Sequence, residues 1–488
     1  MLLYESLIAA MLRYPHTRVI GSRQTRTYTE LLDEHIQKRD ILRATFPRDG
    51  ARIMIAAQNY PGYLSTLLAV WAGGAVPILA DPALTAHERA ALIDGCGIDG
   101  VISEPAESDP SDGATVALDA RTSLRPSGFR GTVPDIACDT ELGRLTSGST
   151  RTPACIEFSA AAVLNAATTW AAAVELTPTD RTLCLAGIYN GLAFNTTVIP
   201  SLLTGAAMVL SSAPPTGGTV LRLITATAPS ILVAFPAAYE RLAAHPAESM
   251  PLATREALAG IRLRLSSAAR LPESTATRFE LLSGPVCDYY GLAETGPVTF
   301  DSAPEDGRHG RPLPGTTIRI APRAHDGVPI LHVRTASMGT RYLNYPGEFE
   351  RNLAEDGSYI TSDTGTFVDG RLRLDGRARP TLEVGGRKFS IESVRTAILD
   401  YPGVSDCHIA QLTTPTGRDC VGALVAADSG FDVTALTGHL RVHLARFKVP
   451  EVILVVPELP RGTTGKVRAV AARSLLTATF DRTGSENS

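Results

Sequence analysis

Four hydroxyl side chains and one glycine occupy five consecutive positions of this chain, at Thr146, Ser147, Gly148, Ser149 and Thr150. A phosphate group suits such a loop, because backbone N–H groups can approach closely at glycine and the hydroxyls add further donors. A short apolar segment precedes the loop, and no lysine completes it. We therefore predict a phosphate-binding loop of unusual composition.

Two carboxylates follow strand-like segments further along the chain. Glu294 ends the segment 288–294, and Asp363 lies in a turn after residues 359–361. Beside a phosphate loop, a carboxylate can hold Mg²⁺ together with phosphate oxygens. An aspartate after a strand can accept both ribose hydroxyls of a nucleotide. Each pattern also has an ordinary explanation, since a surface turn accounts for Glu294 and a turn cap accounts for Asp363.

Lysine is scarce in this chain, which makes each lysine informative. Of 46 basic residues only four are lysine, at positions 38, 388, 448 and 466. Lys466 ends the Gly/Thr-rich segment 462–466. A lysine on such a loop can move onto a developing negative charge, because its ammonium group sits on a flexible stem. A solvated loop lysine is the ordinary alternative.

The elements that must position these residues alternate between strand-like and helix-like segments. This alternation favours an α/β protein with largely parallel sheets. The expected strands are 52–57, 75–80 and 231–234, and the expected helices are 1–14, 61–73, 160–175 and 237–244.

The character of the sequence changes after Gly376. Short strands are expected at 371–374, 381–384, 407–412 and 420–426, with helices at 390–400 and 432–444. We predict a large N-terminal domain over 1–376 and a small, mobile α+β domain over 377–480. The polar segment 481–488 is predicted to be disordered.

Composition excludes several classes of partner. The chain has 488 residues, of which 44% are hydrophobic and 20% charged, and its net charge is -4. These values are typical of a soluble globular protein and argue against a nucleic-acid partner. No apolar run reaches the ~20 residues that a membrane span requires. The seven cysteines form no Cys-x-x-Cys pair, which favours free thiols and a cytoplasmic location.

The order and spacing of these motifs resemble the adenylate-forming superfamily. That superfamily includes acyl- and aryl-CoA synthetases, peptide-synthetase adenylation domains and firefly-type luciferases. The resemblance covers nearly the whole chain. Further matching motifs lie at Thr27–Leu31, Ala69–Pro77, Gly310–Gly315 and Arg446–Pro450.

The resemblance implies a role for each nucleotide-binding residue. The loop from Thr146 to Thr150 would hold the phosphates of ATP. Glu294 would bind Mg²⁺, while Tyr290 and Gly291 would border the adenine and the acyl pocket. Asp363 would hold the ribose.

Three further roles concern the small domain. Arg377 would assist Asp363, and Lys466 would bridge the substrate carboxylate and the α-phosphate. In the family, the small domain is a lid that rotates about a hinge, which corresponds here to Arg379. The family therefore implies adenylation followed by a rotation that admits an acceptor.

The chain departs from the family pattern at the phosphate loop. The family usually continues Gly-x-Pro-Lys-Gly, where this chain has Arg151-Thr152-Pro153-Ala154-Cys155. Ala154 thus replaces the lysine that normally contacts the departing phosphates. We hypothesise that Arg151 partly replaces it. The frequent pocket histidine corresponds to Ile188, which points to a specialised branch.

The acid pocket is predicted to be of medium size and partly aromatic. Nothing in it corresponds to the acid that anchors the α-amine of an amino acid, so an aryl or short acyl acid is favoured. The predicted pocket residues are Ile188, Tyr189, Asn190, Phe194, Phe235, Tyr239, Ser266, Ala268, Tyr289 and Leu292.

These observations predict an ATP-dependent ligase that adenylates a small aromatic or unsaturated carboxylic acid. The acceptor is left open among CoA, a carrier-protein thiol supplied in trans and an amine. One alternative is a diazotase that activates nitrite for attack by an aryl amine. A second alternative is a non-catalytic homologue that binds a nucleotide or an acyl ligand.

Overall fold

The computed structural model describes residues 1–104, 115–146, 152–211, 216–268, 271–301, 310–322, 328–377, 382–384, 387–389, 391–413, 419–444, 446–462, 465 and 467–485. These residues divide into two compact units, the first ending at Asp375 and the second beginning at Gly376. Each unit is described by itself. Among the described residues, no helix combines the length and the apolar character needed to cross a bilayer.

A nine-stranded sheet forms the centre of the first unit. Its six middle strands are parallel, and β2, β15 and β16 extend it in antiparallel pairing. In spatial order the strands are β16 (Arg311–Pro312), β15 (Gly296–Phe300), β14 (Cys287–Leu292), β13 (Leu263–Ser266), β12 (Ile231–Ala234), β10 (Arg181–Cys184), β11 (Ala207–Leu210), β1 (Arg18–Ile20) and β2 (Thr25–Thr27).

A seven-stranded sheet forms the other large layer. Four neighbouring strands, β5, β3, β4 and β8, are parallel, and β8 turns back antiparallel into β9. In spatial order the strands are β6 (Val116–Ala117), β7 (Ser123–Pro126), β5 (Gly100–Ser103), β3 (Arg52–Ala56), β4 (Val76–Leu79), β8 (Thr140–Leu145) and β9 (Cys155–Ser159). The segment between β8 and β9 contains the predicted phosphate loop.

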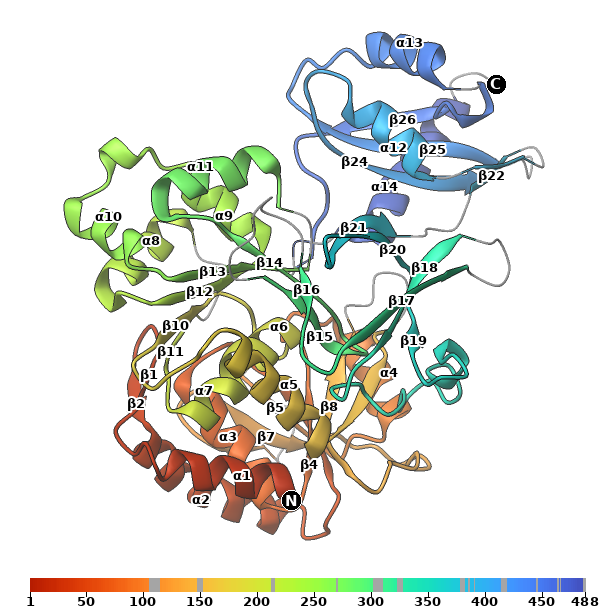
Figure 1. Cartoon of the computed structure of the whole chain (residues 1–488). Helices are drawn as coiled ribbons and strands as arrows, with labels where there is room; N and C mark the ends of the chain where they lie inside the picture. The colour runs from red at the N-terminus through yellow and green to blue at the C-terminus, as the bar shows by residue number, and fades with distance from the viewer. Residues whose placement is uncertain are drawn as a thin grey trace. The chain divides into compact units, whose positions relative to one another are not determined.

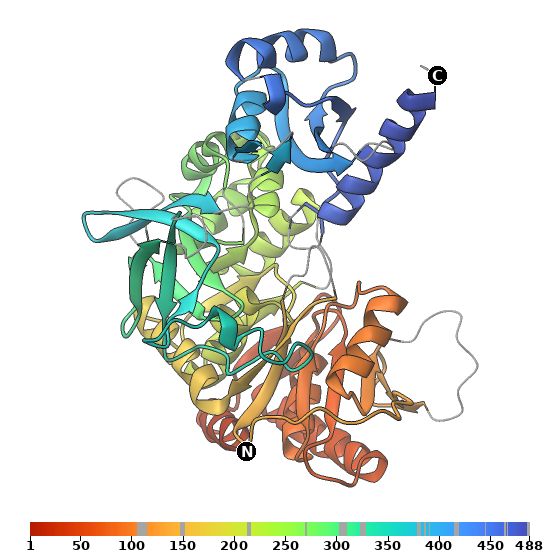
Figure 2. The ribbon, with the colours of Figure 1, turned by 90° about the vertical axis from the view of Figure 1, so that its right-hand side faces the viewer.

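One apolar core joins the two large sheets. It combines inward side chains of both sheets with those of α1 (Leu2–Met11), α2 (Tyr28–Thr45), α3 (Pro61–Ala72), α5 (Ala160–Ala173) and α7 (Ile199–Thr204). Figure 2 shows the red and orange part of this unit as strands with helices packed beside them. Helix α2 begins with a capping box, in which Thr27 and Glu30 satisfy each other's backbone N–H groups.

Helices also cover the outer faces of both sheets. On the nine-stranded sheet they pack as one group around β12 and β13 (Figure 1). This group consists of α8 (Gly217–Thr227), α9 (Pro236–Ala243), α10 (Leu252–Ala259) and α11 (Glu273–Ser283), with the 3-10 turn η2 (Ala247–Ser249). On the seven-stranded sheet, α4 (Ala86–Cys96) covers a smaller core.

Small elements complete the first unit near β14 and β15. Helix α6 (Gly191–Ala193) continues into a π-helical turn, η1 (Phe194–Val198). Two small sheets contain β17 (Thr317–Pro322), β18 (Pro329–Arg334) and β19 (Tyr359–Ile360) in one, and β20 (Asp363–Val368) and β21 (Arg371–Arg377) in the other. A 3-10 turn, η3 (Glu350–Asn352), precedes β19.

The second unit is a smaller α+β arrangement with cores of its own. Its strands are β22 (Leu382–Val384), β23 (Arg387–Phe389), β24 (Val404–Thr413), β25 (Asp419–Ala427) and β26 (Val452–Val456). Its helical segments are α12 (Ile391–Leu399), α13 (Val433–His443), η4 (Arg446–Lys448) and α14 (Ala469–Ser485).

The predicted α/β class with largely parallel sheets is confirmed by this architecture. One expectation at the C-terminus is wrong, because α14 continues through residues 481–485, which the sequence predicted to be disordered. The Ala-rich segment before them starts the helix, and adding residues to an existing helix is easier than nucleating one. The lid role of the second unit stays a prediction.

Candidate active site

Strand β14 and the turn after it bring two of the predicted nucleotide residues into contact with other elements. Tyr290, on β14, donates a hydrogen bond of 2.8 Å from its hydroxyl to Oδ2 of Asp363 at the start of β20. Asp363 is 7% exposed, and its backbone N–H donates to the hydroxyl of Thr361. The two residues that the sequence assigned to adenine and ribose are therefore neighbours in the fold.

Glu294 lies in the turn that follows β14 and is held by a tyrosine that the sequence did not single out. The hydroxyl of Tyr342 donates to Oε1 of Glu294 at 2.8 Å and lies 2.9 Å from the hydroxyl of Tyr359. Burial and the negative charge of Glu294 raise the pKa of Tyr342, so this phenol keeps its proton and remains a donor. The contact fixes one oxygen of the predicted metal ligand.

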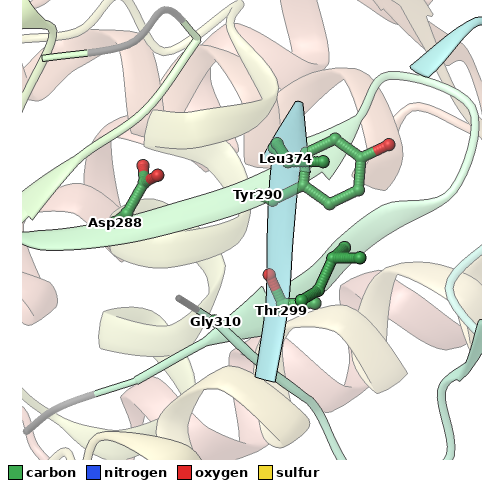
Figure 3. Close-up of a pocket in the computed structure, with 6 residues that line it drawn as sticks. Asp288, Tyr290, Thr299, Gly310 and Leu374 are labelled. Carbon is green, nitrogen blue, oxygen red and sulfur yellow. The ribbon is translucent and has the colours of Figure 1, made fainter. Parts of the chain in front are cut away.

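A small pocket lies beside Tyr290. It has a volume of about 10 Å³ and is lined by Asp288, Tyr290, Thr299, Gly310, Leu372 and Leu374. Figure 3 shows Asp288 and Tyr290 on the same strand, with Leu374 next to the tyrosine ring. The volume suffices for about one water molecule, so this pocket alone does not hold an adenine ring.

Gly291 has a steric reason to be glycine. A Cβ atom at this position would lie 2.6 Å from the carbonyl oxygen of Gly296. The backbone of β14 therefore approaches that of β15 too closely for any side chain at this position. The packing of the two strands is therefore enough to explain a glycine at position 291. The proposed position of Gly291 beside adenine stays a prediction.

Several predicted acid-pocket residues cluster between β14, α5 and η1. Tyr289 packs edge-to-face on Trp170, with the ring centroids 5.5 Å apart. Phe194 is fully buried in the same core. Asn195 and Arg144, neither of which the sequence singled out, both act on the phenol of Tyr289. Nη1 of Arg144 donates to Oδ1 of Asn195 at 3.1 Å, and its guanidinium lies 5.7 Å from the centroid of Phe194.

A buried asparagine positions the loop from Ile188 to Asn190. This residue, Asn59, lies between β3 of the seven-stranded sheet and α3. Asn59 accepts from the backbone N–H of Ile188 at 2.8 Å and donates to the carbonyl of Ala186 at 2.8 Å. Asn190 caps α6 by accepting from the N–H of Leu192. Ile188 is fully buried, and Tyr189 packs at the edge of the same core. These residues therefore lie near the cluster, although Ile188 acts as a core side chain.

Three further residues predicted for the pocket, Tyr239, Phe235 and Leu292, lie in different parts of the first unit. Tyr239 belongs to the core under α8–α11, where it packs edge-to-face on Phe279 and donates to the carbonyl of Leu265. Its placement in the acid pocket is therefore not supported, because a helix residue facing the outer side of the sheet cannot reach the inner one. Phe235 contacts the inner core, and Leu292 contacts a small cluster near β18.

Two predicted residues lie at the carboxyl end of β13, Ser266 as its last residue and Ala268 two residues beyond it. Ser266 is 2% exposed and pairs in register with Asp288, and its hydroxyl has no hydrogen-bond partner within the described part of the chain. Ala268 is exposed and has a φ of 75°, a conformation that is strained for alanine. Both lie at the carboxyl edge of the parallel strands, where open α/β sheets bind ligands.

The residues on either side of the phosphate loop, Thr146 and Ala154, are hydrogen-bonded to each other. The N–H of Thr146 donates to the carbonyl of Ala154 at 2.8 Å, and the N–H of Ala154 donates back to the hydroxyl of Thr146 at 3.0 Å. Ala154 is 5% exposed. The position that carries lysine in the family thus holds a short, buried side chain here.

Several predictions lie outside the described residues. These are Ser147, Gly148, Ser149, Thr150 and Arg151 of the loop, the hinge residue Arg379 and the catalytic candidate Lys466. Arg377 ends β21, and its side chain is not described.

The segment that flanks Lys466 is held within the second unit by one arginine. Arg461 donates to the carbonyl of Gly465 at 2.6 Å and forms an ion pair with Asp406 on β24. The backbone also closes on itself, because the N–H of Gly465 donates to the carbonyl of Gly462 at 2.9 Å. These bonds fix the residue that immediately precedes Lys466.

Comparisons with known proteins identify the family of this chain. A family model described as "AMP-binding enzyme" matches residues 9–343. A feruloyl-CoA synthase from Amycolatopsis sp is 27% identical over 481 residues, which cover 93% of this chain and 94% of the relative. A 3-hydroxybenzoate–CoA ligase from Aromatoleum sp. is 25% identical over 351 residues, covering 68% of this chain and 66% of the relative.

Solved structures share the fold. ATP-bound MatB from Rhodopseudomonas palustris has a TM-score of 0.77 at 22% identity, and the match covers 98% of this chain and 99% of that structure. The family model spans more than half of the chain and includes the phosphate loop, β14 and Glu294. The chain therefore belongs to the AMP-binding enzyme family and is an adenylate-forming ligase.

Proposed function

We propose that this enzyme converts a small aromatic or unsaturated carboxylic acid into its acyl-adenylate and then transfers the acyl group to CoA. The main observation in support is that the segment 290–294 carries Tyr290, bonded to the predicted ribose ligand Asp363, and Glu294, the predicted metal ligand. Two groups that act on different parts of ATP thus come from one strand and its turn.

Adenylation requires positive charge, because both reacting partners are anions. The acid's carboxylate attacks the α-phosphorus of ATP while pyrophosphate leaves, so the site must hold the two in line and offset their repulsion. The carboxylate of Glu294 is a hard oxygen ligand of the kind that Mg²⁺ takes, and Tyr342 orients it. Bound Mg²⁺ would supply positive charge beside the phosphates, and Lys466 is proposed to supply it at the carboxylate.

The nature of the acid is supported by the aromatic cluster and by the relatives. Tyr289 and Phe194, two of the predicted pocket residues, lie in one core with Trp170. The relatives named above are a feruloyl-CoA synthase and a 3-hydroxybenzoate–CoA ligase. Their names also favour CoA over a carrier-protein thiol or an amine as the acceptor.

Acid-dependent exchange of pyrophosphate into ATP tests the proposal. A panel of benzoates, cinnamates and short unsaturated acids is incubated with enzyme, ATP and Mg²⁺, with Lys466→Ala as the control variant. We expect exchange with at least one acid, abolished in the variant, and a thioester when CoA is added. Exchange that no acid supports, or that survives Lys466→Ala, contradicts the proposal. An arm with nitrite in place of the acid tests the diazotase alternative.

A further inference from the structure

Arg144 is a buried cation on the strand that leads into the phosphate loop. It lies near the end of β8 and is 4% exposed. Its guanidinium carbon is 4.4 Å from the ring centroid of Phe158 and 5.7 Å from that of Phe194. Within the described part of the chain, no carboxylate lies within ion-pair distance of it.

The other buried arginines are bonded differently. Four arginines are buried among the described residues, at positions 52, 144, 264 and 371. Arg52 donates to the carbonyls of Cys96 and Pro134, Arg264 donates to Ser283 and to the carbonyl of Ile261, and Arg371 pairs with Asp301. Arg144 makes a single hydrogen bond within the described residues, to the neutral amide oxygen of Asn195.

Arg144 therefore has more N–H donors than it has acceptors among the described residues. A guanidinium has five N–H donors, and buried charges are normally paired. The two phenylalanine faces compensate in part through cation–π attraction. Burial lowers the pKa of Arg144 to about 10, so the group is still positively charged at neutral pH. The carboxylate whose charge acts on it is Glu294, which is hydrogen-bonded to Tyr342.

Two of the side chains around Arg144, Phe194 and Tyr289, belong to the predicted acid pocket. Burial raises the pKa of Tyr289, while the positive charge of Arg144 and a hydrogen bond from Asn195 partly offset this rise. The phenol of Tyr289, the amide of Asn195 and the guanidinium of Arg144 therefore form one polar group. The rings of Phe158 and Phe194 lie against the guanidinium, and Trp170 lies against the phenol. Such a group fits an acceptor that carries negative charge.

We propose that Arg144, with Asn195 and Tyr289, binds a second carboxylate of the substrate, so that the preferred acids are aromatic or unsaturated dicarboxylates. The inference rests on the proposed function, because it concerns the acid that is adenylated. The reacting carboxylate has to meet ATP and the predicted cation Lys466. Arg144 lies among core aromatic side chains, where it is suited to the opposite end of the acid.

Matched pairs of acids test this specificity. Isophthalate is compared with 3-methylbenzoate, 4-carboxycinnamate with 4-methylcinnamate, and glutaconate with 2-pentenoate. In the native enzyme we expect at least one dicarboxylate to exceed its partner in kcat/KM for pyrophosphate exchange. Arg144→Met should lower the ratio of the two kcat/KM values by about 100-fold or more. Most of the change should be in KM, because the second carboxylate of the bound acid loses its cationic partner. Arg144→Lys should restore part of the ratio.

Thermal melting gives a readout that does not depend on turnover. At least one of isophthalate, 4-carboxycinnamate and glutaconate should raise the Tm of the native enzyme, whereas the same acid should produce no such rise in Arg144→Met. Without added acid, Arg144→Met should melt at or above the native temperature, because an apolar side chain replaces a poorly paired buried charge. Arg264→Met is the matched control and should melt lower, since it removes a guanidinium whose bonds are internal.

The outcomes separate this inference from the proposed function. An unchanged ratio in Arg144→Met, an equal loss for both members of a pair, or melting as low as that of Arg264→Met overturns the role of Arg144. Exchange with monocarboxylates alone upholds the ligase and overturns the dicarboxylate site. Arg144-dependent stabilisation by dicarboxylates, without Lys466-dependent exchange, upholds the site and overturns the ligase.

Discussion

The phenol of Tyr342 donates a 2.8 Å hydrogen bond to Oε1 of Glu294, although 48 residues separate the two in the sequence. The hydroxyl of Tyr359 lies 2.9 Å from the same phenol, and the ring of Phe349 packs edge-to-face on it. The orientation of the predicted metal ligand therefore depends on a tyrosine that is itself fixed by aromatic packing.

Removing this hydroxyl should weaken Mg²⁺ binding. In Tyr342→Phe the carboxylate of Glu294 loses its orienting donor, so the Mg²⁺ concentration for half-maximal pyrophosphate exchange should rise roughly 10-fold. Tyr359→Phe is the matched control, because Tyr359 contacts the tyrosine rather than the carboxylate, and its effect should be smaller. A Mg²⁺ dependence that Tyr342→Phe leaves unchanged would show that this contact does not orient a metal ligand.

The contact between Tyr290 and Asp363 predicts how the ribose is recognised. Asp363→Asn replaces a carboxylate that can accept two hydroxyls, so the KM for ATP should rise about 10-fold or more. The native enzyme should also prefer ATP over 2′,3′-dideoxy-ATP, and the variant should lose most of this preference. Tyr290→Phe keeps the carboxylate and should retain the preference. If Asp363→Asn discriminates as well as the native enzyme, Asp363 is not the ribose ligand.

The sequence predicted the framework better than the positions of side chains. The strand over 231–234 was predicted with its observed bounds, because four apolar residues between turns fit a buried parallel strand. Tyr239 was assigned to the pocket but packs on the outer side of the sheet. The direction in which a helix residue points depends on tertiary packing, which one sequence does not reveal.

Arg144 and Tyr342 were missed for different reasons. Arg144 stands between Gly143 and Leu145 in the lead-in to the phosphate loop, and a charged residue within a buried strand was the available signal. Tyr342 gave no signal, since its partner Glu294 is distant in sequence and the pairing depends on the fold.

The pair of Asp180 and Arg262 predicts how the stability of the first unit depends on pH. Burial acts to raise the pKa of Asp180, but hydrogen bonds from Arg262, from the N–H of Thr177 and from Ser230 lower it to about 2. A lowered pKa stabilises the fold above the ordinary pKa of an aspartate, and this contribution is lost as the pH falls toward 2.

Urea unfolding of the Asp180→Asn variant tests this loss of stability at low pH. At pH 7 the variant should be less stable by about 1 to 3 kcal/mol, as expected for hydrogen bonds to a charged group. At pH 3 the difference should shrink, because Asp180 of the unfolded chain is then largely protonated, while in the native protein, where its pKa is about 2, it is still mostly ionised. Asp40→Asn is the control, since Asp40 is 64% exposed and its loss should matter little at either pH. A difference that stays constant between pH 7 and pH 3 would contradict the assignment.

Arg461 should act as a positioning residue for Lys466. It joins Asp406 on β24 to the carbonyl of Gly465, the residue before the lysine. In Arg461→Ala the segment loses this anchor, so the lysine should be less well placed. A misplacement of about 1 Å can reduce rates by about 100-fold, and we expect kcat for pyrophosphate exchange to fall by about 10-fold or more.

The balance between kcat and KM separates positioning from binding. The KM for ATP should change little in Arg461→Ala, because the residues predicted to hold the ribose and the metal lie in the first unit and stay intact. Arg461→Lys should recover part of kcat, since a lysine can still pair with Asp406. Arg441→Ala, on the exposed face of α13, should leave both parameters unchanged. A rise in KM at constant kcat would instead indicate that Arg461 contributes to ATP binding.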